Sequence, residues 1–141
     1  MKKYDLQRFH ETQNSTYEQA LKELRNGHKE THWMWFIFPQ LKGLGSTDYS
    51  VYYGIDGKEE AIAYLRDTVL KKRLIALCET LLELEINDPE KIFSRIDTVK
   101  LRSCMTLFDA VSEEEIFQKV IDQFYDGKKD KKTLRMLGLI Q

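Results

Sequence analysis

The sequence predicts an all-α fold: a single compact domain over residues 1–141, with about seven to nine helices around a Trp-rich buried segment. Apolar residues recur at spacings of three and four along several segments, which is the periodicity of an amphipathic helix. Capping residues and glycines stand where these segments begin and end. No stretch shows the strict apolar–polar alternation of a half-buried strand, and no linker divides the chain.

The first half of the chain is expected to contain several helices in succession. Asp5 can cap a short helix, and Asn14 or Ser15 can cap a second one that ends near Gly27. Ser46 or Thr47 can cap a short tyrosine-containing helix, and helical spacing resumes after two glycines. The strongest periodicity follows, with one apolar face made by Leu70, Leu74, Leu77, Cys78 and Leu81.

The second half of the chain shows the same kinds of helix-start and helix-end residues. Asp88 and Pro89 are a cap followed by proline at the first helical position. Ser112 and Glu115 have the spacing of a capping box and are expected to open the next helix. Between Pro89 and Ser112, an apolar stripe is formed by Leu101, Cys104, Met105 and Phe108. A basic turn at Lys128–Lys132 precedes the last apolar residues of the chain.

The Trp-rich segment contains both tryptophans of the chain. The run from Trp33 to Phe38 is apolar on every side, so it must be buried on every side if it is helical. Pro39 ends it, and we therefore expect His32 to Phe38 to form a central buried segment. The predicted core is Trp33, Trp35, Phe36, Leu74, Leu77, Leu81, Leu101, Met105, Phe108, Phe117, Val120 and Phe124.

Composition excludes several classes of protein. Hydrophobic residues make up 42% and charged residues 32% of the chain, and the formal net charge is -1. This balance is unlike that of a disordered chain and gives no general attraction to nucleic acid or to a membrane surface. No signal peptide is recognised, and the longest apolar run is far below the roughly 20 residues that span a bilayer. We expect a cytoplasmic protein in which Cys78 and Cys104 are free thiols.

Motifs for a metal or a cofactor are incomplete. His28 and His32 are four residues apart, but Glu30 is not where a zinc-protease motif needs it and no third ligand is near. The Gly43–Ser46 loop lacks the third glycine and the preceding strand of a dinucleotide site. We expect no metal, no cofactor and no catalytic residue, because no nucleophile or convergent acid pair is recognisable. Whether the protein is an enzyme stays open.

Polar residues that border the most apolar stretches form a candidate anion site. Arg102 would bind the anion with its planar guanidinium, so Arg102→Ala should abolish stabilisation by an anion. Alternatively, these residues satisfy one another, with Arg102 paired to Asp109 or another carboxylate. The candidate ligand-binding residues are His32, Gln40, Ser46, Lys100, Arg102 and Ser103.

Several stretches carry a family resemblance: Tyr4–Phe9, His32–Gln40, Gly43–Gly45, Lys100–Ser103 and Met105–Phe108. In this order they resemble the signatures of domain of unknown function family 1810 over nearly the whole chain. The resemblance implies an all-helical, single-domain, mostly bacterial cytoplasmic protein and transfers no catalytic residue. Cys104 stands where such sequences usually have serine, which disfavours a nucleophile there. Some relatives are labelled calpastatin, but inhibitory calpastatin regions are disordered and proline-rich, so protease inhibition is not expected.

Two function hypotheses follow from the sequence. The first is a binding module for a small anionic or phosphorylated ligand. The alternative is a protein–protein adaptor or homodimeric structural protein without catalytic activity, so the protein is a monomer or a homodimer. A ligand module needs a concave pocket with convergent polar groups, whereas an adaptor needs an exposed apolar patch larger than monomers usually show.

Overall fold

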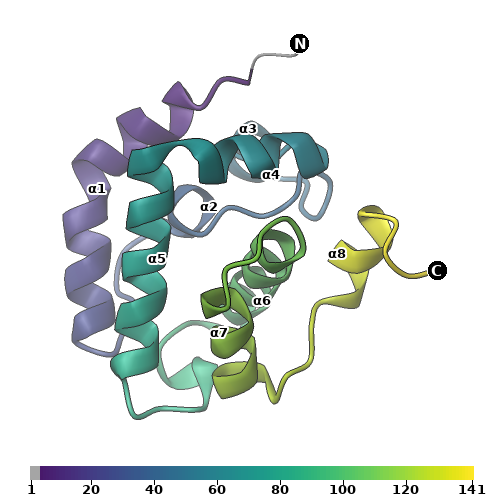
Figure 1. The fold of residues 1–141 in the computed structure, drawn as a ribbon. Coiled ribbons are helices and arrows are strands. Elements are labelled where there is room, and N and C mark those ends of the chain that lie inside the picture. Colours follow the sequence, from purple (N-terminus) through teal and green to yellow (C-terminus); the bar gives the residue numbers. More distant parts are fainter. Residues whose placement is uncertain (1–3) are drawn as a thin grey trace.

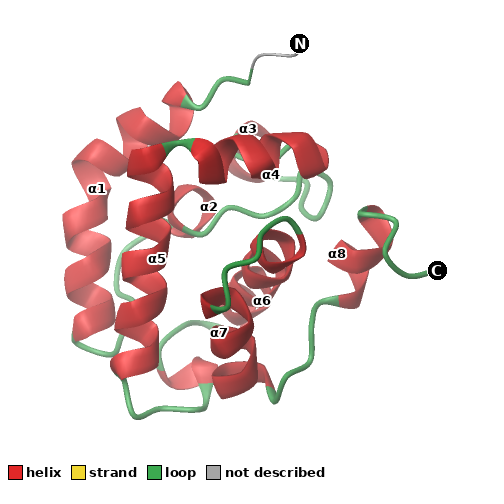
Figure 2. Cartoon of the chain, viewed as in Figure 1, coloured by secondary structure: helices red, strands yellow, loops and turns green. Residues whose placement is uncertain are grey.

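The computed structural model describes residues 4–141 and confirms the all-α fold (Figures 1 and 2). Eight α-helices and one short 3-10 helix lie in this range, and none of its residues forms a named strand. The helices are α1 (Gln7–Arg25), α2 (Met34–Ile37), α3 (Asp48–Tyr52), α4 (Gly57–Arg66), α5 (Thr68–Glu83), η1 (Pro89–Lys91), α6 (Arg95–Ala110), α7 (Ile116–Tyr125) and α8 (Lys131–Met136).

The longer helices form a frame around the short α2. Helices α1 and α5 lie side by side, α7 packs against both α5 and α6, and α4 crosses the end of α5 (Figure 1). Helix α2 packs against α1 inside this frame, and α8 at the C-terminal end packs against α6. Among the described residues, no helix combines the length and the apolar character needed to cross a membrane.

The N-terminal region is one helix where two were expected. Helix α1 runs without interruption through Asn14 and Ser15, and both side chains are exposed on its outer surface. The Ser15 hydroxyl donates back to the Thr12 carbonyl at 3.0 Å instead of capping a new helix. Cap-forming residues in an exposed helix interior can satisfy their side chains in this way, so the break that they predicted does not occur.

The predicted capping box at Ser112 and Glu115 is also wrong. The Ser112 hydroxyl donates to the Phe108 carbonyl at 2.9 Å, so it satisfies the C-terminal end of α6. Glu115 precedes the first residue of α7 but makes no side-chain cap. The predicted caps at Thr47 and Asp88 are present, with their side chains accepting from Ser50 N and Glu90 N.

The predicted core is confirmed with one exception. All of the named core residues are buried except Trp35, which is half-buried. Trp33 has 0% of its surface exposed, whereas His32 at the start of the segment is exposed. The segment forms only the single turn α2, so one side of it faces the core and the other carries Trp35 towards a surface pocket.

The partial exposure of Trp35 limits the expected effect of its substitution. Trp35→Ala should lower the free energy of unfolding by about 1–2 kcal/mol, well below the value for a fully buried aromatic residue, because part of the ring already contacts water. Urea unfolding measures this directly. A loss as large as that of a fully buried aromatic such as Phe108 would contradict the half-buried position.

The two ends of the segment from Gln40 to Ile55 lie side by side and are joined by backbone hydrogen bonds. Ile55 N donates to the Gln40 carbonyl at 2.9 Å, and Lys42 N donates to the Ile55 carbonyl at 2.9 Å. Gly54 is needed at this crossing, because a Cβ there would lie 2.7 Å from Lys42 Cα. The buried Arg8 guanidinium donates to the Gly54 carbonyl at 3.0 Å and so ties the closed end of the segment to α1.

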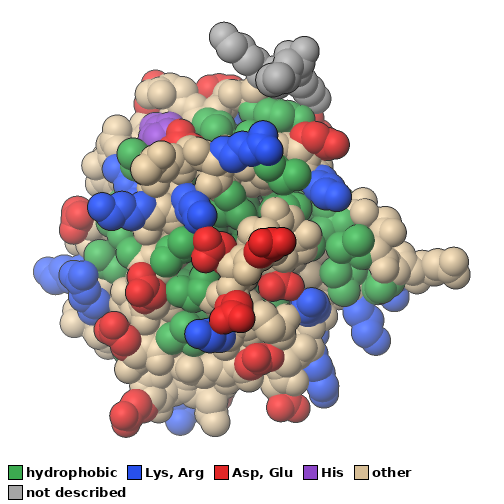
Figure 3. Space-filling model, in the orientation of Figure 1, with side chains coloured by type: hydrophobic (Ala, Val, Ile, Leu, Met, Phe, Trp, Pro, Cys, Tyr) green, Lys and Arg blue, Asp and Glu red, His purple; other side chains and the backbone are tan. Residues whose placement is uncertain are grey.

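Charge is evenly distributed over the face that Figure 3 shows. Lys and Arg side chains are interspersed with Asp and Glu, and apolar side chains lie between them. This face therefore presents no single-sign field, in agreement with the formal net charge of -1.

Candidate functional site

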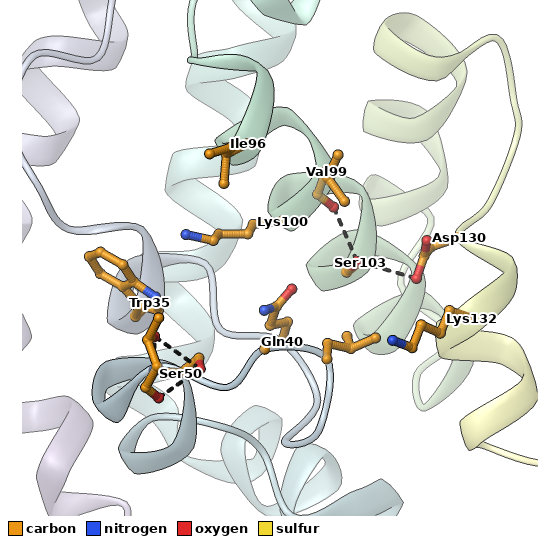
Figure 4. Close-up of a pocket in the computed structure, with 12 residues that line it drawn as sticks. Trp35, Gln40, Ser50, Ile96, Val99, Lys100, Ser103, Asp130 and Lys132 are labelled. Atoms are coloured by element: carbon orange, nitrogen blue, oxygen red, sulfur yellow. Dashed lines mark hydrogen bonds between the residues drawn. The ribbon is translucent and has the colours of Figure 1, made fainter.

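A pocket of about 480 Å³ lies between α2, the loop with α3, and helices α6 and α8 (Figure 4). Its volume is within the range of small-molecule sites. It joins parts of the chain that are distant in sequence. Its lining residues are Trp35, Gln40, Leu44, Gly45, Thr47, Ser50, Ile96, Val99, Lys100, Ser103, Asp130 and Lys132.

Lys100 supplies a positioned positive charge on the α6 side. Its Nζ lies 4.3 Å from the centre of the Trp35 ring and 3.6 Å from an Asp97 carboxylate oxygen. Asp97 is shared, because its other oxygen lies 3.0 Å from Lys29 Nζ. The ring and the carboxylate together restrict the ammonium group to the edge of the pocket.

Asp130 fixes the α8 side of the pocket. Its Oδ2 accepts from Ser103 Oγ at 3.2 Å and from Thr133 N at 3.0 Å, which joins α6 to the start of α8. The Asp130 N–H donates to Thr106 Oγ1 at 2.9 Å. This cap places Lys132 in the first turn of α8, on the pocket wall. Within residues 4–141, Lys132 has no carboxylate partner.

The loop side of the pocket is built around a close approach between Gly45 and Ser50. A Cβ at position 45 would lie 2.9 Å from Ser50 Oγ, so this contact requires glycine. Ser50 is buried and its hydroxyl donates to the Thr47 carbonyl at 2.8 Å. The Thr47 hydroxyl oxygen in turn accepts from Ser50 N at 3.2 Å and caps α3.

Gln40 is a polar side chain of the pocket lining. Figure 4 shows its amide directed into the space between Lys100 and Ser103. Its backbone carbonyl is used by Ile55, but within the part of the chain that the structure describes its side-chain amide has no hydrogen-bond partner. The amide can therefore donate to and accept from a bound molecule.

The remaining walls are apolar. Ile96 and Val99 are 69% and 58% exposed, although they lie on the helix that carries Lys100. Leu44 and one side of Trp35 complete these walls. Neither cysteine nor histidine lines the pocket. The Ser50 hydroxyl donates to the Thr47 carbonyl, and the Ser103 hydroxyl lies within hydrogen-bond distance of the Val99 carbonyl and the Asp130 carboxylate.

The structure brings together three of the six sequence-predicted residues. Gln40, Lys100 and Ser103 line the pocket, and Ser46 lies exposed between two loop residues that line it. His32 is exposed and lies outside the lining.

Arg102 also lies outside the pocket lining. Its Nε donates to the Lys128 carbonyl at 2.9 Å, and its guanidinium lies 5.6 Å from the centre of the Tyr125 ring. The alternative pairing with Asp109 is not formed either, because Asp109 pairs with Lys129 at 3.1 Å.

Sequence reasoning missed Trp35, Asp130 and Lys132 as pocket residues. The sequence predicts Trp35 in the core and Lys132 in a basic turn. One signal was present: Asp130 followed by Thr133 has the spacing of an N-cap. That cap predicts a helix start that places Lys132 in its first turn, although not the wall that it would face.

No metal centre is formed within residues 4–141, where no three His, Cys, Asp or Glu residues come together. Cys78 and Cys104 are both buried free thiols, as expected. Burial raises the pKa of both thiols above their ordinary range, so neither carries the thiolate character of a reactive cysteine.

Comparison with known proteins places the chain in a family. The sequence profile described as "Protein of unknown function (DUF1810)" matches residues 3–137. The chain belongs to the DUF1810 family. Among solved structures it is similar to the conserved hypothetical protein Rv1873 from Mycobacterium tuberculosis, with 39% identity and a TM-score of 0.94. The similarity covers 97% of this chain and 99% of that chain. The search of curated proteins found no match.

Proposed function

We propose that this DUF1810 protein binds a small organic anion in the pocket between α2, α6 and α8. The observation that carries the proposal is the combination, in one largely apolar pocket, of a Gln40 side-chain amide and a Lys132 ammonium group that have no hydrogen-bond or carboxylate partner within residues 4–141. Lys100 adds a second positive charge. A pocket with apolar walls and a few polar groups is the usual form of a small-molecule site.

The position of Lys100 supports binding. Trp35 and Asp97 restrict its ammonium group, whereas Lys132 is exposed and the Asp130 cap places only its backbone at the pocket wall. A ligand that meets preorganised groups loses less conformational entropy on binding than one that must order flexible side chains. The cation held over Trp35 is also partly desolvated, which strengthens its attraction to an anion.

Thermal-shift titration with organic carboxylates, phosphate esters and inorganic anions tests the proposal. A ligand that binds only the folded protein stabilises it by about 2.7 kcal/mol at a free concentration one hundred times Kd. The Lys132→Ala variant should lose most of this gain. Lys131→Ala is the matched control, because Lys131 lies next to Lys132 in α8 but does not line the pocket. An equal gain in both variants, or no gain with any anion, contradicts the proposal.

A protein–protein role has one observation in its favour. Tyr49 and Tyr52 of α3 are 59% and 56% exposed, and Tyr49 stacks on Trp35 with ring centres 5.2 Å apart. Exposed aromatic residues are enriched at interfaces. Analytical ultracentrifugation distinguishes this candidate: a dimer that dissociates in a Tyr49→Ser, Tyr52→Ser double variant supports it, and a monomer at all concentrations removes self-association.

A further inference from the structure

We infer that the ligand is an amphipathic monocarboxylate, with an apolar body and one carboxylate, rather than a phosphate ester or a nucleotide. The inference rests on the proposed function and specifies the chemical class that the pocket selects. Three features of the pocket carry it: the sum of its charges, its side-chain donors, and the exposed apolar wall.

The charges of the pocket balance a monoanion. Lys100 and Lys132 contribute two positive charges and Asp130 contributes one negative charge, so the lining residues sum to one positive charge. Asp97 already neutralises part of the Lys100 charge. A phosphate ester carries up to two negative charges near neutral pH. It would therefore leave one charge unbalanced while facing the Asp130 carboxylate, and a nucleoside diphosphate or triphosphate would leave more.

The groups that phosphate sites prefer are reduced at this pocket, because each of its two short helix starts already uses one backbone N–H in a cap and no arginine lines it. Phosphate sites commonly use free N–H groups at a helix start or the planar fork of an arginine. Two helices start at this pocket, and each start is capped by its own side chain: Thr47 accepts from Ser50 N in α3, and Asp130 accepts from Thr133 N in α8. No arginine is among the lining residues.

The side-chain donors of the pocket suit the two oxygens of a carboxylate. They include the Lys100 and Lys132 ammonium groups and the Gln40 side-chain NH₂. In Figure 4 the Gln40 amide lies between the two lysines, which reach the pocket from α6 and α8. A carboxylate beside Gln40 would receive hydrogen bonds from an amide and from at least one ammonium group, which is the stronger, charge-assisted kind.

The apolar wall accounts for the rest of the ligand. Ile96 and Val99 are more than half exposed in the free protein, and Leu44 lies on the opposite, loop side of the pocket. An apolar body between these residues would remove their side chains from water, which favours binding. Acetate has the charge but lacks this body, so it should bind much more weakly than a longer carboxylate.

Two matched ligand series test the class. One contains octanoate, octyl phosphate and octanamide, the other hydrocinnamate, phenethyl phosphate and hydrocinnamamide, with acetate as the ligand without a body. Isothermal titration calorimetry at neutral pH gives each Kd. In at least one series, the carboxylate should bind roughly fivefold more tightly than its phosphate ester and its amide, since one unbalanced charge or one lost exposed ion pair is worth up to about that factor.

The outcomes separate the inference from the proposed function. A phosphate ester that binds as tightly as the carboxylate overturns the inference but leaves anion binding intact. An amide that binds equally tightly, or no binding by any member, overturns both. Trp35 serves as a local reporter: ligand should change the tryptophan emission of the wild type, and Trp35→Phe should remove that change because the other tryptophan, Trp33, is fully buried away from the pocket.

A variant of Asp130 tests the charge argument directly. Asparagine also caps helices, so Asp130→Asn retains a capping oxygen for α8 while it removes the negative charge from the pocket. The phosphate ester should then gain several-fold in affinity relative to the carboxylate. An unchanged ratio of the two Kd values in a folded Asp130→Asn variant shows that the Asp130 charge does not set the preference and overturns this part of the inference.

Discussion

The Phe108→Ala variant is expected to lose about 3–5 kcal/mol of its free energy of unfolding. Phe108 has 0% of its surface exposed and lies on α6 where that helix meets the rest of the core. Its ring centre is 5.1 Å from that of Tyr64 in α4 and 6.0 Å from that of Phe117 in α7. Truncation would therefore leave a cavity between three helices that cannot close without moving all of them.

Urea unfolding followed by circular dichroism measures this loss, and Leu139→Ala provides the matched control. Leu139 is 56% exposed near the C-terminal end, so its truncation should change the free energy of unfolding by no more than about 0.5 kcal/mol. Similar midpoints for the two variants would show that Phe108 does not occupy the central position that its burial indicates.

The second large effect is expected at Glu23, a buried carboxylate that holds the loop after α1. It is 2% exposed and accepts from Glu30 N at 2.7 Å, from Thr31 N at 2.9 Å and from Trp33 Nε1 at 2.9 Å. The Thr31 hydroxyl and the Gln19 amide donate to its other oxygen. One side chain thus satisfies the loop that leads into the Trp-rich segment.

These hydrogen bonds make part of the stability depend on pH. Burial alone would raise the pKa of Glu23, but hydrogen bonds from Thr31, Gln19 and Glu30 outweigh it and lower the pKa from 4.5 to about 2. A lowered pKa in the folded state means that ionised Glu23 stabilises the fold above pH 4.5. This contribution, on the order of 3 kcal/mol, should be lost as the pH falls from 4.5 towards 2.

Glu23→Gln isolates that contribution. The variant places an NH₂ group among donors, so it should be destabilised at neutral pH and should lose less stability than the wild type between pH 5 and pH 3. Glu18→Gln is the matched control, because Glu18 is exposed on the same helix. Other carboxylates affect wild type and variants alike, so the difference between the curves reports Glu23. Parallel curves for wild type and Glu23→Gln would contradict this role.

Much of the fold could be predicted because helical periodicity and burial have the same physical cause. Leu74, Leu77 and Leu81 share one face of α5, and a chain with that spacing buries the face wherever it finds a partner. Trp35 shows where this reasoning ends. Six apolar residues in a row have no polar side, so the sequence cannot indicate which of them borders a pocket rather than the core.

The site was predictable only in part. Gln40 and Lys100 were identified because polar residues beside an apolar run must find a partner or a surface, and the structure brings both to one pocket. Lys100 and Arg102, however, are two residues apart on a helix and so point about 160° away from each other. They cannot face one pocket together, and the structure has Lys100 but not Arg102 in the pocket lining.

The closed end of the Gln40–Ile55 segment has a consequence for how this family can diversify. The segment starts and ends at the same pair of hydrogen bonds, and Tyr53 inside it packs in the core against Phe9 and Phe36. The stretch 42–49 before it is at least partly exposed. Each doubling of a loop's length adds only about 0.6 kcal/mol of closure entropy, so this stretch can be lengthened while Tyr53 stays in the core. It carries Leu44, Gly45 and Thr47 of the pocket wall, so a change in its length would reshape the pocket while the helical frame stays the same.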